Sequence, residues 1–344
     1  MSHFDVSWKI VPLSLKHAFT ISRSSRTEAR NVFLSISKNG ITGYGEAAPN
    51  SRYEETPEKV IEYFRALPTH LFDEISSPEN LPQKLDNSEL PSIQSAKVAI
   101  EMAWLDWWGK SQNAPLWKLW KAKSPVGPVT SFTIGIDKPE IMQKKIEEAA
   151  HYPVYKIKLG TDRDREIIKA IREVTTKPLR VDANEGWKSL KQAKREIEFL
   201  SDQNVEFIEQ PMPASCLEDM KQLKMWSPLP LAADESFVGS ENLLEISEAF
   251  DIINIKLMKI GSLIKARNVI SNAKDIGLKV MIGCMIESSL ANAAGALIAL
   301  EADYADLDGH LLIDNDPFEG LSVYPKGNVA LCDNLGLGVS KLDF

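Results

Sequence analysis

The sequence predicts an α/β fold in which an α+β segment precedes a parallel α/β barrel. In the second part of the chain, short apolar stretches typical of buried strands recur at intervals of 21 to 28 residues. Amphipathic stretches long enough for helices separate them, and acidic or lysine residues stand at several strand ends. The eight expected strands begin near Ser131, Val154, Pro178, Glu206, Pro230, Asp251, Lys279 and Tyr304.

The first hundred-odd residues lack this regular alternation and are predicted to be α+β. Residues 30–37 and 41–47 flank Asn39 and Gly40, a pair typical of the type I′ turn of a β-hairpin. The other expected elements are a strand over 7–15 and helices over 57–67 and 93–110, with polar loops over 21–29 and 49–56.

Seven helices fit between the eight expected strands, as in a parallel barrel. The first begins at Asp137-Lys-Pro-Glu140, where Asp137 is expected to cap the helix. A doubly wound sheet is the alternative, but no G-x-G-x-x-G motif follows a strand. The tail after residue 311 is expected to return to the N-terminal segment. The other helices are expected over 164–174, 189–201, 217–225, 243–249, 263–275 and 289–301.

The composition and net charge limit the kinds of molecule that the protein is expected to bind. The 344 residues carry a formal net charge of −8, which argues against nucleic acid or an anionic membrane. Cys216, Cys284 and Cys332 are too few and too widely spaced for a disulfide framework. The N-terminus does not resemble a signal peptide, and the most apolar stretch, 293–300, is too short to span a bilayer. We therefore expect a cytoplasmic protein that acts on a small molecule, and the sequence leaves open whether it forms a homo-oligomer.

Two lysines in one expected strand give the first sign of a charged site. Lys156 and Lys158 lie two positions apart, so both ammonium groups point to the same face of the strand. Like charges at this spacing destabilise each other. A solvated edge strand is the alternative for an isolated Lys-x-Lys, whereas an anion held between the two lysines would explain the pair.

Three carboxylates stand at the ends of the next three expected strands. Asp182, Glu209 and Asp234 are 27 and 25 residues apart (209 − 182 and 234 − 209), about one strand plus one helix each time. Because the strands of a parallel barrel end at the same rim, these side chains are expected to converge. A single carboxylate there often caps a helix, but three together would repel one another unless they bind a cation. Ligands that offer only oxygen favour Mg²⁺ over Zn²⁺, so one Mg²⁺ per chain is predicted.

A further lysine, Lys256, stands in the sixth expected strand, across the barrel from Lys158 in the second. A carboxylate substrate held at the metal between them would present one lysine to each face of its α-carbon. This arrangement suits removal of the α-proton from one face and its return to the other, through an enediolate. Mg²⁺ and the neighbouring ammonium groups are expected to lower the lysine pKa, so that one lysine is partly neutral.

With these residues in order, the chain resembles the enolase superfamily, in its muconate lactonizing enzyme subgroup. The resemblance implies a (β/α)7β TIM-like barrel closed by an N-terminal α+β capping domain. It also implies that the three carboxylates bind Mg²⁺, that Lys158 and Lys256 are the acid/base catalysts, and that Lys156 contacts the substrate carboxylate. The motifs that carry it are Lys156-Ile-Lys158, Asp182-Ala-Asn184, Glu209-Gln-Pro211, Asp234-Glu-Ser236 and Ile255-Lys256-Leu257 with Gly261. The implied division is a capping domain over 1–124, completed by the tail from about 316 to 344, and a barrel domain over 125–315.

The eighth strand end distinguishes among the cycloisomerases, dehydratases and epimerases of this subgroup. Asp306-Leu-Asp308 looks like the Asp-x-Asp motif of dipeptide epimerases. Two carboxylates on one face of a strand form an anionic pocket for an α-ammonium group, although an isolated Asp-x-Asp can also be a plain polar strand end. The resemblance implies an isomerase, a Mg²⁺-dependent dipeptide epimerase that inverts the C-terminal residue of L-Ala-D/L-Glu or a related Ala-X dipeptide. Such a dipeptide would come from bacterial cell-wall peptides.

Two alternatives stay open at this point. One is a lyase or cycloisomerase of the same subgroup, similar to o-succinylbenzoate synthase, whose substrate carries no ammonium group for Asp306 and Asp308. The other is a non-catalytic binding protein on the same scaffold, which would not need the complete set of lysines and carboxylates.

Loop residues are expected to complete the site. Arg26 resembles the loop arginine that L-Ala-D/L-Glu epimerases use for the glutamate side chain, and Arg23 is a competing candidate. Lys259 is expected to face the other side of an extended strand and, like Asn184 and Glu235, to lie behind the site. The substrate pocket is expected to be lined by Phe19, Tyr53, Thr133, Cys284 and Met285.

Overall fold

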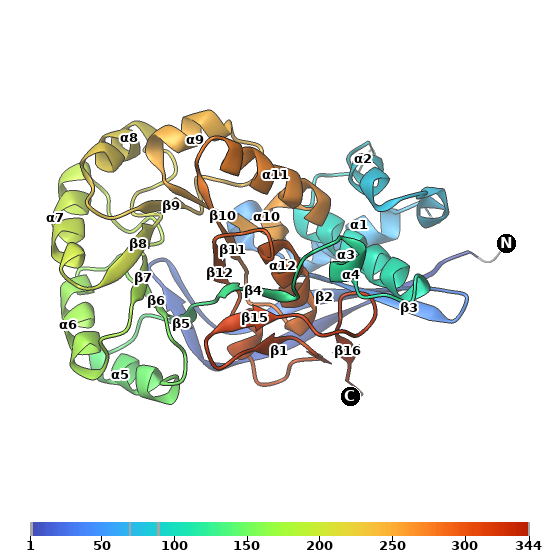
Figure 1. The fold of residues 1–344 in the computed structure, drawn as a ribbon, viewed down its shortest axis with the longest axis horizontal. Coiled ribbons are helices and arrows are strands. Elements are labelled where there is room, and N and C mark those ends of the chain that lie inside the picture. The colour runs from blue at the N-terminus through green and yellow to red at the C-terminus, as the bar shows by residue number, and fades with distance from the viewer. Residues whose placement is uncertain (1–2, 69, 88–89, 343–344) are drawn as a thin grey trace.

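The computed structural model describes residues 3–68, 70–87 and 90–342, so the ends of the predicted capping segment and tail, 1–2 and 343–344, lie outside it. Figure 1 shows helices α5 to α9 in an arc around the barrel strands, with α1 to α3 on the other side of the molecule. The long strands β1 and β2 extend from those helices towards the barrel. The predicted fold class, an α/β barrel with an N-terminal α+β segment, is confirmed.

The barrel is a parallel sheet that, within the described residues, has eight strands hydrogen-bonded in chain order from β5 to β12. A parallel bridge between Thr130 and Ala305 joins the segment before β5 to β12 and so closes the ring. The strands are β5 (Phe132–Ile134), β6 (Tyr155–Lys158), β7 (Leu179–Asp182), β8 (Val205–Glu209), β9 (Leu231–Ala233), β10 (Ile252–Lys256), β11 (Lys279–Gly283) and β12 (Tyr304–Asp306).

The barrel helices follow the predicted ranges closely, with two differences. Asp137 does not cap the first helix: its carboxylate accepts a hydrogen bond from Lys138 N at 2.8 Å and pairs with Lys145 at 3.0 Å, while Lys138 occupies the N-cap. A short helix directly after β10 was not predicted. The helices are α5 (Pro139–Glu148), α6 (Asp164–Val174), α7 (Leu190–Ser201), α8 (Leu217–Trp226), α9 (Leu243–Ala249), α10 (Leu257–Ile260), α11 (Leu263–Asp275) and α12 (Ser289–Ala299).

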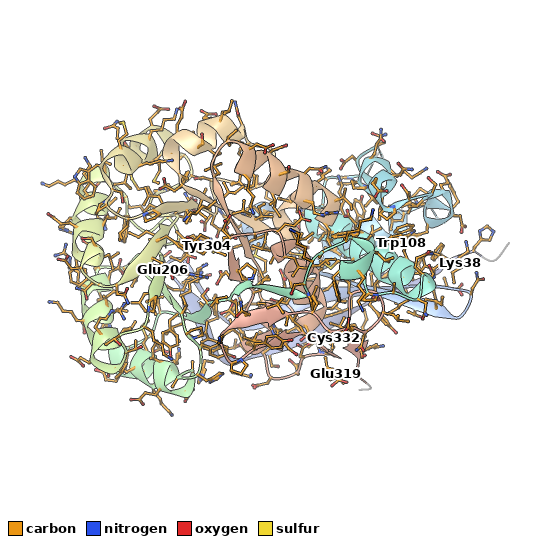
Figure 2. The ribbon with its side chains drawn as sticks, viewed as in Figure 1. Lys38, Trp108, Glu206, Tyr304, Glu319 and Cys332 are labelled. Carbon is orange, nitrogen blue, oxygen red and sulfur yellow. The ribbon has the colours of Figure 1, made fainter. Side chains whose placement is uncertain are left out.

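The inside of the barrel is filled at the end where the strands begin. Arg180 pairs with Glu206 at 2.9 Å, lies 5.3 Å from the ring of Tyr304, and donates to the carbonyl of Ala305 at 2.7 Å; Glu206 and Tyr304 are labelled in Figure 2. The ring of Phe207 packs against Tyr304 beside them, at 5.3 Å. With this end closed, the inward-facing residues at the opposite, C-terminal ends of the strands are left to form a site.

The N-terminal segment is an antiparallel three-stranded sheet covered by helix α3. Asn39 and Gly40 have φ of 54° and 77°, as the predicted type I′ turn requires. Gly45 lets α3 approach the sheet, because a Cβ at this position would lie 1.8 Å from the carbonyl oxygen of Ala99. The elements are β1 (Asp5–Ile21), β2 (Ser24–Lys38), β3 (Ile41–Ala47), α1 (Pro57–Ala66), α2 (Leu81–Asp86), α3 (Gln94–Ser111) and α4 (Leu116–Leu119).

The prediction of a polar loop over 21–29 is wrong for most of that stretch. Residues from Ser24 onward belong to β2, and Phe19 is the cross-strand partner of Arg26. Polar side chains on both faces of this hairpin end hide the alternating pattern on which the strand prediction depends, whereas backbone pairing does not need that pattern.

The C-terminal tail lies against both parts of the chain. Phe318 packs on the N-terminal sheet, 5.8 Å from the ring of Phe33 and 5.5 Å from that of Tyr44. Its strands are β13 (Phe318–Glu319), β14 (Ser322–Val323), β15 (Asn328–Ala330) and β16 (Ser340–Lys341), and β15 pairs with β4 (Val126–Val129). Within the described residues, no helix combines the length and apolar character needed to cross a membrane.

Glu101 joins the N-terminal segment to the barrel. It is fully buried on α3, and its carboxylate accepts a hydrogen bond from Ile264 N at 2.8 Å, with the Leu263 N–H and the hydroxyl of Ser262 close by, at the start of α11. Burial raises the pKa of Glu101 to about 7, despite these donors. The stability that this group contributes is therefore complete below its ordinary pKa near 4.5 and is lost as the pH rises through 7.

We expect Glu101→Gln to remove this pH dependence. Relative to the wild type, the free energy of unfolding of the variant should rise between pH 4.5 and 7 by on the order of 1 to 3 kcal/mol and stay level above. Urea unfolding at several pH values measures this difference, with the exposed Glu79→Gln as the control. A difference between Glu101→Gln and wild type that does not vary with pH would contradict the assignment.

Candidate active site

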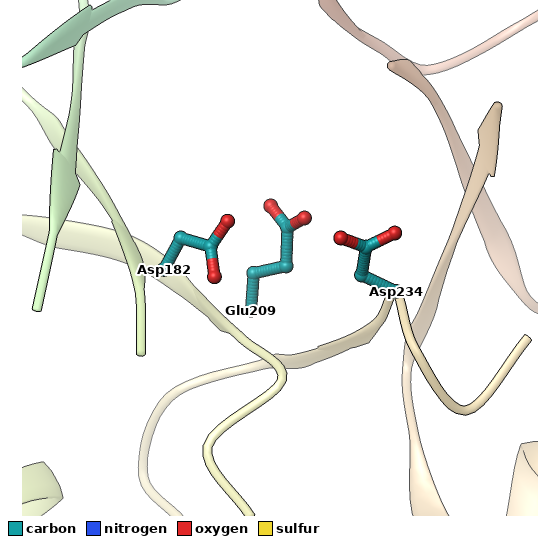
Figure 3. Close-up of side chains that lie close together, drawn as sticks. All are labelled: Asp182, Glu209 and Asp234. Carbon is teal, nitrogen blue, oxygen red and sulfur yellow. The ribbon is translucent and has the colours of Figure 1, made fainter. Parts of the chain in front are cut away.

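Three buried carboxylates converge where β7, β8 and β9 end. Asp182 and Glu209 are cross-strand partners, and Asp234 follows the last residue of β9. One oxygen from each lies within 4.8 Å of the others. Figure 3 shows the carboxylate of Glu209 between those of the two aspartates. The structure thus brings together the three residues predicted as metal ligands.

Lys158 and Lys256 lie at the two ends of this row of carboxylates. Lys158 Nζ is 2.6 Å from Asp182 Oδ2, and Lys256 Nζ is 2.7 Å from Asp234 Oδ2. The row itself therefore separates the two lysines, which come from β6 and β10. Their positions agree with the expectation that they approach a central substrate from opposite sides.

Lys156 makes different contacts from Lys158, although both side chains leave the same face of β6. Its Nζ lies 2.7 Å from Glu209 Oε2, 3.1 Å from Asp182 Oδ2 and 2.7 Å from Asp306 Oδ2. Lys156 is thus at the centre of the charge cluster, between the predicted metal ligands and the eighth strand, while Lys158 lies at its edge.

The buried charges shift one another's pKa strongly. Burial alone would raise the pKa of Asp182, but Lys158 and Lys156 lower it to about 2. Burial and the charge of Asp182 raise the pKa of Glu209 to about 7. Burial would lower the pKa of Lys256, but Asp234 and Glu209 raise it. This is the reverse of the lowering expected from a nearby cation, because the carboxylates act on this lysine more strongly than the neighbouring ammonium groups do.

Each of the three carboxylates has one oxygen held by a donor on its outer side. Asp182 Oδ1 accepts from Asn184 N at 2.9 Å, Glu209 Oε1 from the side-chain amide of Asn254 at 2.9 Å, and Asp234 Oδ1 from Lys259 Nζ at 2.8 Å. The second oxygens, Asp182 Oδ2, Glu209 Oε2 and Asp234 Oδ2, are the ones that contact Lys156, Lys158 and Lys256. The three carboxylates are thus oriented alike, with inner oxygens that face the lysines.

This donor set fits a divalent cation. Glu209 Oε2 accepts no hydrogen bond within the described part of the chain, although Lys156 Nζ is close. All three inner atoms are oxygens of buried carboxylates, the ligands that Mg²⁺ prefers. Asp182, Glu209 and Asp234 are therefore the residues that would hold Mg²⁺.

Asp306 and Asp308 lie beside this cluster but are held differently. Asp306 pairs with Lys156 and accepts from the Ser131 hydroxyl at 2.6 Å, so both of its oxygens have partners. Asp308 Oδ2 accepts from Thr133 N at 2.6 Å. Burial and the charge of Asp306 raise the pKa of Asp308 to about 6. Asp308 is therefore the less strongly paired of the two carboxylates predicted to receive an ammonium group.

A pocket of about 90 Å³ opens above these groups. Asp182, Glu209 and Lys259 do not line it and lie deeper in the barrel. Residues of β1 and β2 and of the segment around Tyr53 form its outer wall, so the N-terminal segment contributes to the site. The residues named in the sequence analysis that line it are Phe19, Arg26, Tyr53, Thr133, Lys156, Lys158, Asn184, Asp234, Glu235, Lys256, Cys284, Met285, Asp306 and Asp308, together with Arg23. Asn184 and Glu235 were expected to lie behind the site, whereas the structure places them in the pocket lining.

The two arginines of the hairpin end have different surroundings. Arg23 pairs with Glu235 at 2.7 Å and donates to the carbonyl of Asn184 at 3.1 Å, so it ties the hairpin to the barrel. Arg26 forms no ion pair with the other described residues. Burial and the charge of Arg23 lower the pKa of Arg26. Of the two, Arg26 is the cation that faces the pocket without a carboxylate partner.

Lys259 lies behind the pocket, on Asp234, but its predicted orientation is wrong. It does not face the other side of an extended strand, because the chain turns into α10 directly after Lys256. Lys259 Nζ therefore comes back to Asp234, on the opposite oxygen from Lys256 Nζ.

The sequence predictions gave no role to several residues around the site. Asn254 lies two positions before Lys256 in β10, so strand alternation places both side chains on the inner face. Arg52 pairs with Glu185 at 2.9 Å across the two parts of the chain, and no local pattern indicated this pair. The pocket lining also includes Ile21, Asn50, Arg52, Ile286 and Leu312.

Comparisons with known proteins agree with this architecture. Residues 141–342 match the family described as "Enolase C-terminal domain-like", and residues 5–120 match "Mandelate racemase / muconate lactonizing enzyme, N-terminal domain". The chain is 39% identical over 331 residues to the L-Ala-D/L-Glu epimerase of Bacteroides thetaiotaomicron, covering 96% of this chain and 86% of that protein. It is 37% identical to an L-Ala-D/L-amino acid epimerase of a Maribacter species, covering 98% and 99%.

Solved structures give the same result. A substrate-liganded L-Ala-D/L-Glu epimerase from Bacillus subtilis superimposes with a TM-score of 0.89 over the whole of both chains, at 26% identity. A dipeptide epimerase from Enterococcus faecalis, in complex with Mg and L-Leu-L-Tyr, gives 0.86 at 30% identity, covering 98% of this chain and all of that one. The barrel, the three strand-end carboxylates and the family matches over both parts of the chain lead to one assignment: the chain belongs to the enolase superfamily, among the proteins with mandelate racemase/muconate lactonizing enzyme domains.

Proposed function

We propose that this protein is a Mg²⁺-dependent dipeptide epimerase that inverts the α-carbon of the C-terminal residue of L-Ala-D/L-Glu or a related Ala-X dipeptide. The observation that carries the proposal is the position of Lys158 and Lys256 at opposite ends of one row of carboxylates, with Asp306 and Asp308 to one side. Relatives that cover nearly the whole chain are epimerases of L-Ala dipeptides by name, which supports it.

In this proposal, charged residues of the site bind both the ammonium end and the carboxylate end of a dipeptide. Asp308, with Asp306 beside it, receives the α-ammonium group at the end of β12. Lys156 Nζ lies between this pair and the metal ligands, so it is placed to contact the carboxylate at the other end. A substrate that lacks the ammonium group, such as that of o-succinylbenzoate synthase, would leave Asp308 without a cationic partner, with only the Thr133 N–H bound to it.

The two lysines then transfer the proton. With the substrate α-carbon between them, a neutral Nζ of one lysine takes the α-proton, and the charged Nζ of the other donates a proton to the opposite face. The direction of inversion reverses when the two lysines exchange protonation states. Bound Mg²⁺ supplies positive charge next to the substrate carboxylate as negative charge builds up there.

Arg26 provides a cation for the side chain of the second residue. It lines the pocket on β2, opposite Phe19 of β1, and has no carboxylate partner in the described residues. A substrate with an acidic second residue, such as glutamate, would supply that partner. Arg23 is the weaker candidate because Glu235 already pairs with it.

We also propose a separate role for each of the two parts of the chain. Residues up to 124, with the tail from about 316, act as the capping domain that completes the pocket, and residues 125–315 carry the catalytic groups. A cytoplasmic location, with dipeptides from cell-wall peptides as the substrate, is a further part of this proposal, which leaves the oligomeric state open.

Incubation with L-Ala-L-Glu and Mg²⁺ in D₂O tests the activity. We expect the α-proton of the second residue to exchange with deuterium while L-Ala-D-Glu accumulates, as measured by NMR and chiral chromatography. The first residue should keep its proton and configuration. Absence of exchange across a panel of Ala-X dipeptides would contradict the proposed function.

The variant Arg26→Met tests the role given to Arg26. Its kcat/KM for L-Ala-L-Glu should fall about 10- to 100-fold, since a hydrogen-bonded charge pair is lost, while L-Ala-L-Met should react as in the wild type. Arg30→Met on the same strand is the matched control, because Arg30 is exposed and pairs with Glu58. Equal losses for both substrates would exclude Arg26 as a determinant of the second residue.

A further inference from the structure

One of the three metal-ligand candidates is held by a charged donor, whereas the other two are held by neutral ones. The outer oxygen of Asp182 accepts from a backbone N–H, and that of Glu209 from the amide of Asn254. The outer oxygen of Asp234 accepts from the ammonium group of Lys259 at 2.8 Å. A positive charge this close to a cation site is unfavourable on electrostatic grounds alone, so its presence needs a separate explanation.

Lys259 is immobilised by its contacts. Its side chain has no exposed surface, and Nζ also donates to the carbonyl oxygens of Asp234 at 2.7 Å, Phe237 at 2.7 Å and Asn254 at 3.1 Å. An ammonium group has three hydrogens, so these four oxygens use its full capacity. The partners come from β10, the end of β9 and the loop after it, and Lys259 therefore fixes the backbone around Asp234 as well as its carboxylate.

The turn into α10 creates this arrangement. Lys256 is the N-cap of α10, and Lys259 lies within its single turn. The helix ends at Gly261, whose φ of 77° suits a glycine, and where a Cβ would lie 2.1 Å from the side chain of Gln94. As a result, Lys256 and Lys259 reach the two oxygens of one carboxylate, Oδ2 at 2.7 Å and Oδ1 at 2.8 Å.

We propose that Lys259 is a positioning residue for the metal site: it fixes Asp234 Oδ1 and thereby keeps Oδ2 turned towards the cation and Lys256. Without Lys259, the carboxylate of Asp234 would be held only through Oδ2, by Lys256, and the carbonyl oxygens of Asp234, Phe237 and Asn254 would lose the hydrogen bonds that the Lys259 ammonium group donates. Loss of the partner that orients a metal ligand lowers metal affinity about 10- to 100-fold. This inference depends on the Mg²⁺ site of the proposed function and not on the identity of the substrate.

A positioning role and a purely electrostatic role predict opposite changes in Mg²⁺ affinity when Lys259 is removed. If Lys259 acts only through its charge, its removal should tighten Mg²⁺ binding, because a repelling cation is gone. If it positions Asp234, its removal should weaken Mg²⁺ binding despite the lost repulsion. Lys256 provides the matched comparison, since it places an equal charge on the other oxygen of the same carboxylate but makes no other hydrogen bond in the described part of the chain.

The experiment measures Mg²⁺ affinity by isothermal titration calorimetry for the wild type, Lys259→Met, Lys259→Gln and Lys256→Met, without substrate. Lys259→Gln keeps an N–H donor and covers the case in which Lys259→Met does not fold; near-UV circular dichroism verifies the fold, and the rise in Tm with added Mg²⁺ gives a second measure of binding. We expect both Lys259 variants to bind Mg²⁺ at least about tenfold more weakly, and Lys256→Met to bind it as tightly as the wild type or more tightly.

Mg²⁺ binding by the Lys259 variants that equals or exceeds that of the wild type would overturn the inference. Equal weakening in Lys256→Met would also overturn it, because the effect would then follow from any change at Asp234. If the wild type itself does not bind Mg²⁺, the Mg²⁺ site of the proposed function is contradicted. This result can be told apart from one that contradicts only the role of Lys259, in which the wild type binds Mg²⁺ and the Lys259 variants bind it equally well.

Discussion

The mutual repulsion of three buried carboxylates is the constraint on which the rest of this structure depends. Asp182, Glu209 and Asp234 lie together in the barrel, where solvent does not screen their charges. Such a group is stable only if cations and hydrogen-bond donors compensate it. The protein supplies Lys156, Lys158, Lys256 and Lys259 for this purpose, and the first three of these lysines are groups that the proposed reaction needs.

The fold gives each of these charges a fixed direction. Because parallel strands end at one rim, the ligands come from consecutive strands in register, with Lys158 opposite Asp182 and Asp182 opposite Glu209. The end of the barrel where the strands begin is filled by Arg180 and aromatic rings, so the carboxylates and lysines of the site gather at the C-terminal ends of the strands. The N-terminal hairpin then covers the site and is tied to the barrel by Arg23 and Glu235.

Much of this could be predicted from the sequence, since the signals for it are local. Alternation within strands placed Lys156 and Lys158 on one face, and the spacing of the strand ends placed the three carboxylates together. The predictions failed where neighbours far along the chain decide the structure. Lys259 was placed on the wrong side because α10 is a single turn, stabilised by tertiary contacts and without a helical sequence pattern of its own. The hairpin strands were too short because polar residues near Arg26 hide their alternation. The pairing of Asp306 with Lys156 was not predicted, because it depends on a strand 150 residues away.

The central claim is that Lys158 and Lys256 act on opposite faces of one α-carbon. Deuterium exchange by Lys158→Ala and Lys256→Ala, each with L-Ala-L-Glu and with L-Ala-D-Glu in the presence of Mg²⁺, tests it most directly. The account predicts that neither variant epimerises, and that each one exchanges the α-proton of a single diastereomer, a different one for each variant. Exchange of both diastereomers by one variant, or of the same diastereomer by both, would contradict it.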